Sequence, residues 1–238
     1  MTVVIALKSA NYLQPSGRNL EFEPGIIMAG DTRLSWIGVR RKHEDDHVKI
    51  DSIGNYAIAG YAGRQDIATA VLTKLEDNIK AGGDYSTGAI TSLTKDMMDK
   101  EIAKHGALAD TTVELLLAIK DIGTGKFLLY KMTSYNEFTP ESQDGMTVIG
   151  SHGHYVKDIF EKVRDKAISL QNDPFRGPNV NLKENLALFI KLLLDNLIEV
   201  AVTQDGDSSL VGGETHLVIL HSSGIEAMNP EAYKRLVL

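Results

Sequence analysis

The stretch MTVVIALK, residues 1–8, places a threonine directly after the initiator methionine and an apolar run directly after the threonine. The run at residues 3–7 is typical of a buried strand. Once the methionine is removed, Thr2 carries a hydroxyl and a free amine on one residue. A threonine hydroxyl is a weak nucleophile unless a base lies beside it. An α-amino group, with an unperturbed pKa of roughly 7.7–8.0, suits that task near neutral pH. The alternative is that Met-Thr is only a common way for a chain to begin.

The elements beyond this stretch arrive as blocks of strands separated by pairs of helices. We expect strands at residues 3–7, 25–31, 48–53 and 55–63, helices at 67–79 and 86–105, strands at 112–120, 127–132 and 146–149, helices at 156–170 and 181–202, and a strand at 216–220. Residues 9–24 and 40–47 are polar or charged and predict a hairpin excursion and a loop. This order predicts one α+β domain, residues 1–238, with helices on both outer faces of stacked sheets.

The composition is that of an ordinary globular protein, with 43% hydrophobic and 24% charged residues. A net charge of −7 argues against a broad nucleic-acid-binding face. The chain has no cysteine, which excludes disulfides, cysteine nucleophiles and thiolate metal sites. No apolar run approaches the ~18 residues of a membrane span, and the N-terminus lacks a signal peptide. We expect a cytoplasmic protein that binds neither nucleic acid nor membrane.

Three motifs suggest ligand sites, and each has a plainer interpretation. DIGTGK, residues 121–126, lacks the remaining parts of a phosphate-binding loop and predicts a hairpin turn. The charged residues 43–47, HEDDH, have the side chains of a metal site but are also typical of a solvated loop. His152 and His154 lie close together without a third ligand. We therefore expect neither a metal nor a cofactor.

Two charged residues lie within or at the end of apolar stretches. Asp31 ends the strand of GIIMAGDTRLS, where a carboxylate either caps a turn, pairs with Arg33 or serves a site. Lys49 lies between Val48 and Ile50, so we expect it on a strand, facing away from both. It is either an edge-strand lysine that prevents aggregation or a partly buried cation that lowers the pKa of its neighbours.

Together these pieces resemble the β-type subunits of the proteasome and the bacterial peptidase HslV, which are N-terminal nucleophile hydrolases. A bacterial offshoot such as Anbu or the betaproteobacterial proteasome homologue is a further match. The matching pieces are TVVIALK at 2–8, GIIMAGDTRLS at 25–35, VKI at 48–50, AIAGYAGRQDIA at 57–68 and VIGSHGHY at 148–155. The resemblance covers most of the chain and implies a four-layer αββα sandwich.

The resemblance also implies a catalytic set. Thr2 is the position of the nucleophile, and Asp31 and Lys49 match the aspartate and lysine that assist it. The backbone N–H of Gly63 matches the donor that stabilises the oxyanion, and Ser151 matches a serine close to the amine. A supporting aspartate and serine are expected within TQDGDSSLVGG, residues 203–213, where the register stays open. The candidates there are Asp205, Asp207 and Ser208.

By the same resemblance, the substrate binds as an extra strand beside the nucleophile. The matching substrate-binding residues are Arg33, Leu34, Ser35, His47, Asp51, Tyr61 and Gln65. This mixture predicts no particular side-chain preference. The chain departs from the family in its longer excursion at residues 9–24 and in His152, which stands where the family has a glycine.

The resemblance implies a threonine peptidase that works inside a self-compartmentalised homo-oligomer of stacked rings. Its substrates would be unfolded chains or peptides, and an ATP-dependent unfoldase is an expected partner. Two alternatives stay open. One is an amidase or transpeptidase with the same chemistry and a narrow substrate. The other is a ring-forming scaffold that has lost activity, as proteasome α-type subunits have.

Overall fold

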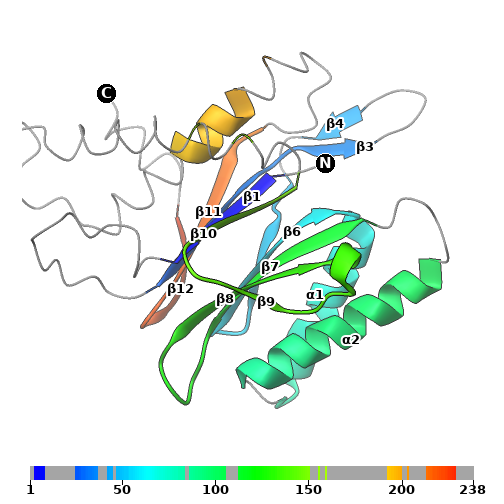
Figure 1. The fold of residues 1–238 in the computed structure, drawn as a ribbon, viewed down its shortest axis with the longest axis vertical. Coiled ribbons are helices and arrows are strands. Elements are labelled where there is room, and N and C mark those ends of the chain that lie inside the picture. Colours follow the sequence, from blue (N-terminus) through cyan, green and yellow to red (C-terminus); the bar gives the residue numbers. More distant parts are fainter. Residues whose placement is uncertain are drawn as a thin grey trace, which may run out of the picture.

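The computed structural model describes residues 3–8, 25–36, 42–44, 47–83, 86–105, 112–150, 155, 159, 192–199, 203 and 213–228 (Figure 1). The strands are β1 (Val3–Lys8), β2 (Ile26–Asp31), β3 (Leu34–Trp36), β4 (Lys42–Glu44), β5 (Ile50–Ile53), β6 (Ala57–Gly63), β7 (Val113–Lys120), β8 (Phe127–Thr133), β9 (Glu141–Gln143), β10 (Met146–Gly150), β11 (Thr215–His221) and β12 (Gly224–Met228). The helices are α1 (Gln65–Lys80), α2 (Thr87–His105) and a 3-10 turn, η2 (Ser134–Asn136), and residues 192–199 are also helical.

The described strands form two five-stranded sheets and a two-stranded ribbon. The N-terminal sheet has the order β10-β1-β2-β11-β12, and the helix-covered sheet has the order β5-β6-β7-β8-β9. Strands β3 and β4 pair with each other in the ribbon. Every neighbouring pair runs antiparallel. The protein is therefore an α+β fold with two antiparallel sheets, as the sequence predicts.

The two sheets stack face to face and enclose a hydrophobic layer (Figure 1). Because side chains alternate between the faces of a strand, every second residue of each strand enters this layer. The contributing residues from four of the strands are Val4 and Ala6, Ile26 and Met28, Ile58 and Ala62, and Leu116 and Ala118. This layer fixes the position of β1 over the helix-covered sheet.

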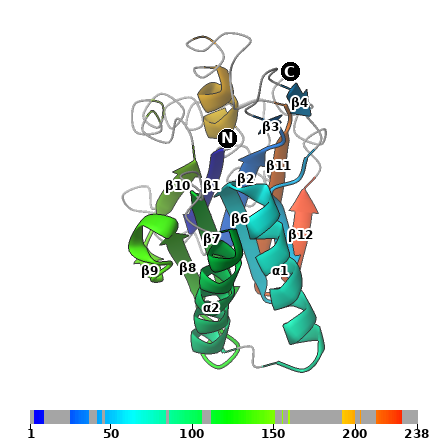
Figure 2. The same cartoon turned by 90° about the vertical axis from the view of Figure 1, so that its right-hand side faces the viewer.

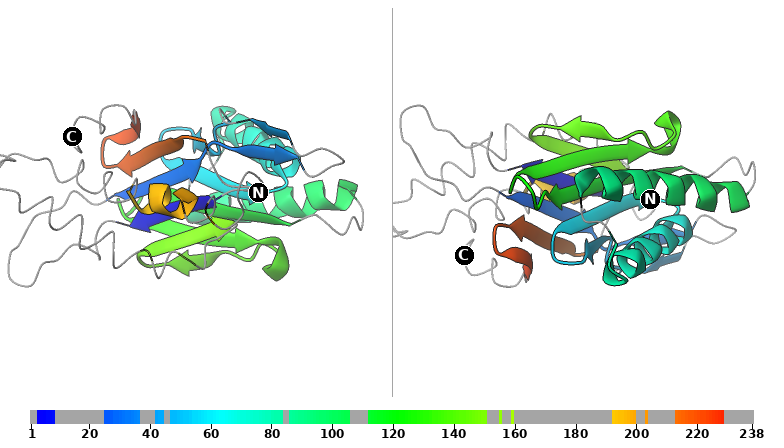
Figure 3. Two further views of the ribbon diagram at one scale, coloured as in Figure 1. Left: turned by 90° about the horizontal axis from the view of Figure 1, so that it is seen from above. Right: turned by 90° about the horizontal axis from the view of Figure 1, so that it is seen from below.

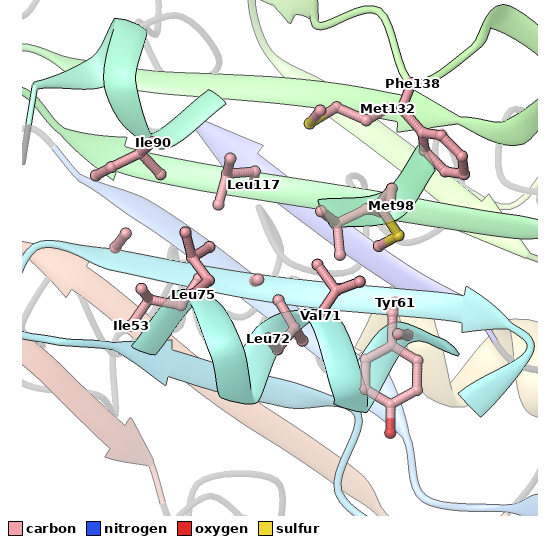
Figure 4. Packing of buried hydrophobic residues seen from close by; sticks show 14 of the residues in the cluster. Ile53, Tyr61, Val71, Leu72, Leu75, Ile90, Met98, Leu117, Met132 and Phe138 are labelled. Carbon is pink, nitrogen blue, oxygen red and sulfur yellow. The ribbon is translucent and has the colours of Figure 1, made fainter. Parts of the chain in front are cut away.

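Helices α1 and α2 lie side by side on the other face of the helix-covered sheet (Figures 2 and 3). The apolar residues of α1 recur on one face, and Ile67, Val71, Leu75 and Ile79 are buried against the sheet. Figure 4 shows Val71 and Leu75 among them. The sequence prediction for α1 is confirmed. Helix α2 is less regular, because its buried face includes Thr94 and Glu101 as well as Ile90 and Met98.

The helix side of this core predicts a large cost for truncating Leu117. This residue is fully buried on β7, in the layer that Leu75 and Ile90 also enter (Figure 4). We expect Leu117→Ala to lower the free energy of unfolding by about 2–5 kcal/mol, because transfer free energy is lost and a cavity remains. Urea unfolding measures the change. A cost similar to that of trimming the exposed Ile122 to alanine would contradict the packing described here.

The helical residues 192–199 lie on the opposite side of the molecule, against the N-terminal sheet. Val218 and Leu220 of β11 enter the layer between the sheets, so Thr215 faces outward by alternation. Its hydroxyl donates to Asp195 Oδ1 at 3.0 Å, and Leu193 and Leu197 beside Asp195 are fully buried. The outward face of the N-terminal sheet is thus covered at the end where β1 begins.

Several details of the sequence prediction are wrong. The strand expected at 48–53 begins only at Ile50, and the strand expected at 55–63 begins at Ala57, after a turn. The loop expected at 40–47 contains β4, and β12 follows the strand expected to be the last. The turn expected at 121–126 is confirmed, because Asp121 accepts bonds from both the amide and the hydroxyl of Thr124.

Other predictions fall on residues that the structure does not describe. These are the excursion at 9–24, the helix at 156–170 except for its residue 159, and the first part of the helix at 181–202. Within the described ranges, no helix is long and apolar enough to cross a membrane.

Candidate functional site

The site begins with Asp31, the last residue of β2. Strands β1 and β2 run antiparallel, so the end of β2 lies beside the start of β1. The Asp31 side chain is fully buried, and its Oδ1 accepts a hydrogen bond from the backbone N–H of Val3 at 2.8 Å. A buried carboxylate is therefore bonded to the residue that follows Thr2.

Lys49 supplies the opposite charge. Its side chain is 1% exposed, and Nζ donates to Asp31 Oδ1 at 3.0 Å and also to the backbone carbonyl of Arg33. The backbone around Lys49 is held on both sides, because His47 N–H donates to Thr32 O and Tyr61 N–H donates to Lys49 O. Lys49 is thus not an edge lysine in solvent, and it precedes β5 rather than lying within it.

The burial of this ion pair carries a large free-energy cost. Taking a carboxylate and an ammonium out of water costs several kcal/mol per ion, so a buried ion pair is a poor way to stabilise a fold. The cost is tolerable here because the two charges meet and each has a further hydrogen bond. The Val3 amide and the Lys49 ammonium share one oxygen of Asp31. This arrangement holds a fixed positive charge next to the start of the chain.

Gly63 ends β6 at the same end of the molecule, two residues beyond Tyr61, whose amide bonds to Lys49. Its φ of +95° is a conformation that residues with side chains rarely adopt. A Cβ built on Gly63 would lie 2.0 Å from the carbonyl oxygen of Thr112. That oxygen accepts the N–H of Arg64 at 3.0 Å, so it is not free to move away. Only glycine fits this position.

The consequence is a prediction with a matched control in the same chain. Gly82 has a similar φ of +90° but no atom within 4 Å of a built Cβ. We expect Gly82→Ala to cost about 1–2 kcal/mol of unfolding free energy from backbone strain alone. Gly63→Ala adds a clash with backbone, so its loss in a chemical-denaturation measurement should be clearly larger. Equal losses for the two variants would contradict the close approach of Thr112.

A polar cluster lies beside the pair. His47 Nε2 and the Tyr61 hydroxyl are 2.7 Å apart, and Gln65 Nε2 lies 3.5 Å from His47 Nδ1. Burial raises the pKa of the Tyr61 hydroxyl, and the charge of Asp51 adds to this effect. Burial also raises the pKa of Asp51, against the opposing effect of His47. His47, Tyr61 and Gln65 are thus joined by close polar contacts, and Asp51 interacts with His47 and Tyr61 through its charge.

The structure brings together part of the set predicted from sequence. Asp31, Lys49 and the backbone of Arg33 are in contact, His47, Tyr61 and Gln65 are linked, and Gly63 lies at the same end. Leu34 and Ser35 lie in β3, directly after this segment. The remaining predicted residues lie outside the described ranges: Thr2, Ser151, Asp205, Asp207 and Ser208.

Sequence reasoning missed two contacts near the site. The Thr32 hydroxyl accepts the Glu214 N–H at 2.8 Å, which joins the end of β2 to the start of β11. Glu114 accepts the backbone N–H of Gly150 at 2.6 Å. The signal for Glu114 was present, because it is a carboxylate near the start of the otherwise apolar run VELLLAI, residues 113–119.

Comparisons with known proteins leave the site to be interpreted from its own geometry. No model of a known protein family matches the chain, and no curated protein matches it. Among the described side chains, no group of three or more histidines, cysteines, aspartates or glutamates is placed to hold a metal ion.

Proposed function

We propose that the chain is a threonine peptidase of the proteasome β-type and HslV-like class, with Thr2 as its nucleophile after removal of Met1. The observation that carries this proposal is the shared oxygen of Asp31, which accepts both the Val3 amide and the Lys49 ammonium. A buried ion pair bonded to the third residue of a chain has little value for stability. Beside an N-terminal threonine, it has a clear chemical use.

In the proposed reaction, the Thr2 hydroxyl attacks a peptide carbonyl. The Thr2 amine takes the hydroxyl proton and passes it to the leaving amine. The Lys49 ammonium favours the alkoxide by its charge, and Asp31 keeps that ammonium oriented. The N–H of Gly63 donates to the developing oxyanion, and Ser151 supports the amine. An acyl ester forms on Thr2, and water then cleaves it to release the product and restore the hydroxyl.

The architecture supports a four-layer αββα sandwich for this single domain. Helices α1 and α2 cover one sheet, the two sheets stack, and residues 192–199 lie on the outward face of the N-terminal sheet. In this fold the N-terminus opens at one end of the stacked sheets. The site residues lie at that end, where β1 begins and where β2 and β6 finish.

The proposed substrate is an unfolded chain that binds in an extended conformation along the backbone of Ser35 and Gly63. Its side chain would lie near His47, Asp51, Tyr61 and Gln65. A nucleophile that attacks any accessible peptide bond needs restricted access. We therefore propose cytoplasmic homo-oligomeric rings that enclose the site, with an ATP-dependent unfoldase as the partner that delivers substrates.

A product survey tests this function. The purified chain, checked by mass for loss of Met1, is incubated with a denatured protein and with defined peptides, and the products are sequenced by mass spectrometry. Cleavage at many sites supports the peptidase. Cleavage at one site, or ligated products, would instead indicate a narrow amidase or transpeptidase. No product from any substrate would contradict an enzymatic role.

A further inference from the structure

The edge of β10 is bound by two side chains from the opposite sheet. In the described part of the chain, β10 is an outer strand of the N-terminal sheet, with β1 on one side. Glu114 of β7 accepts the N–H of Gly150 at 2.6 Å, and Lys131 of β8 donates to the carbonyl of Val148 at 3.4 Å. The Lys131 ammonium is also 3.7 Å from Glu114 Oε1.

The pair matches the hydrogen-bonding pattern of a strand edge. In an extended strand, the C=O of one residue and the N–H of the residue two positions later point to the same side. Glu114 offers an acceptor to the N–H, and Lys131 offers a donor to the C=O. The two side chains are only 19% and 27% exposed, and the short bond from the Gly150 N–H to the Glu114 carboxylate is of the charge-assisted kind, stronger than a bond between neutral groups. Together they take the place of a neighbouring strand.

The contact between Glu114 and Gly150 lies at the end of the stacked sheets where β1 begins. Glu114 is opposite Ala62 in the ladder of β6 and β7, next to Gly63. Gly150 is opposite Val3 in the ladder of β1 and β10. The carboxylate therefore links β7, the neighbour of the strand that carries Gly63, to β10, the strand that pairs with Val3. Gly150, the last residue of β10, has a φ of +90°.

Protection of an exposed edge is the alternative explanation, because charged side chains often prevent edge-to-edge pairing. It does not account for the arrangement at Glu114. A charge that protects an edge is carried by the edge strand itself, whereas Glu114 belongs to β7, an inner strand, and lies on the face that packs between the sheets, as Leu116 and Ala118 do. Its bond crosses from one sheet to the other.

We propose that Glu114, oriented by Lys131, is a positioning residue that fixes the end of β10 against β7. It thereby fixes the start of β1, which pairs with β10, relative to Gly63. The role in catalysis rests on the proposed peptidase function, whereas the mechanical role, holding β10, does not. The two parts can therefore be tested separately.

The test compares Glu114→Ala, Glu114→Gln and Glu141→Ala in the full chain. Glu141 is a suitable control because it also accepts a side-chain bond, from Asn136 at 2.6 Å, on an exposed part of the helix-covered sheet. Hydrogen exchange followed by mass spectrometry reports on residues 146–155. In Glu114→Ala, we expect exchange at Gly150 to be faster by about tenfold or more. Glu114→Gln keeps an acceptor oxygen and should stay within about threefold of the native protein.

Peptide hydrolysis supplies the second measurement. We expect Glu114→Ala to lower kcat by about tenfold or more with KM within about twofold, because misplaced groups affect the reacting geometry more than binding. Glu114→Gln should restore most of kcat, and Glu141→Ala should leave it unchanged. A purely structural role would lower the amount of active protein in Glu114→Ala, which active-site titration detects, without changing kcat per titrated site.

Each outcome decides a part of the proposal. Unchanged exchange at Gly150 in Glu114→Ala would overturn it entirely. Faster exchange with unchanged kcat per site would overturn the positioning role and keep only the mechanical one. If the native protein hydrolyses no peptide, the proposed function fails, and the exchange result alone decides whether Glu114 holds β10.

Discussion

Replacing Lys49 by methionine is expected to reduce peptide hydrolysis by about 10²–10⁴-fold, the range that a group assisting proton transfer supplies. It is also expected to lower the free energy of unfolding by about 3–5 kcal/mol. Both effects follow from the burial of the pair, because Lys49 is 1% exposed and Asp31 is fully buried. Without the ammonium, Asp31 is a buried carboxylate whose charge has lost its nearest compensation.

A second substitution separates the loss of activity from the loss of stability. Asp31→Asn removes the remaining charge and still offers an oxygen to the Val3 N–H. In the double variant Lys49→Met, Asp31→Asn, we expect most of the stability to return, because removing both charges avoids the unpaired one. Peptide hydrolysis should stay lost. Recovery of hydrolysis together with stability would show that Lys49 serves the fold and not the reaction.

Lys8, the last residue of β1, provides the control for a lysine in an exposed ion pair. Its ammonium pairs with Asp144 at 2.9 Å, but Asp144 is 74% exposed. Ion pairs at the surface contribute about 0–1 kcal/mol, so Lys8→Met should change stability by no more than that and leave hydrolysis intact. A loss of hydrolysis similar to that of Lys49→Met would contradict the special role of the buried pair.

Replacing Thr2 by alanine is expected to reduce hydrolysis to the background rate, because the hydroxyl that forms the acyl ester is absent. Thr2→Ser keeps both the hydroxyl and the amine and should retain measurable hydrolysis. Thr2→Val keeps the shape of the side chain without the hydroxyl and should be as inactive as Thr2→Ala. Initial rates at matched protein concentration measure all three, and each variant keeps a small second residue that allows removal of Met1.

The Thr2 variants should also separate activity from stability. We expect them to change the free energy of unfolding far less than Lys49→Met does, because none of them leaves a buried charge without its partner. Full hydrolysis by Thr2→Val would show that the nucleophile is another residue.

The sequence correctly predicted the elements that bury one or both of their faces, because burial leaves a pattern of apolar residues. Strand β1 is an unbroken apolar run, and α1 repeats its apolar residues at helical spacing. The ribbon strand β4 was missed because its sequence, KHE, is charged, and only the pairing with β3 makes it a strand. Strand β12 was missed for a similar reason, because its pairing with β11 follows a short turn. Local pattern does not encode such pairings.

At the candidate site, too, sequence predicted some features and missed those that depend on how distant segments pack. The sequence singled out Asp31 and Lys49 as charges at the end of, or within, apolar stretches, and the family resemblance joined them. The structure adds the shared oxygen and the depth of burial, which depend on how β1, β2 and the segment before β5 pack. Glu114 and Gly150 are 36 positions apart and lie in different sheets. Their contact depends on sheet stacking, which no local spacing reveals.

The most direct test of the central claim is the intact mass of the purified protein before and after treatment with a threonine-directed peptide epoxyketone. This reagent needs both the hydroxyl and the free amine of an N-terminal nucleophile. We predict a native mass that lacks Met1 and gains a single inhibitor adduct, and a Thr2→Ala variant that gains none. A protein that retains Met1, or a processed protein that takes no adduct, would contradict the assignment of Thr2 as the nucleophile.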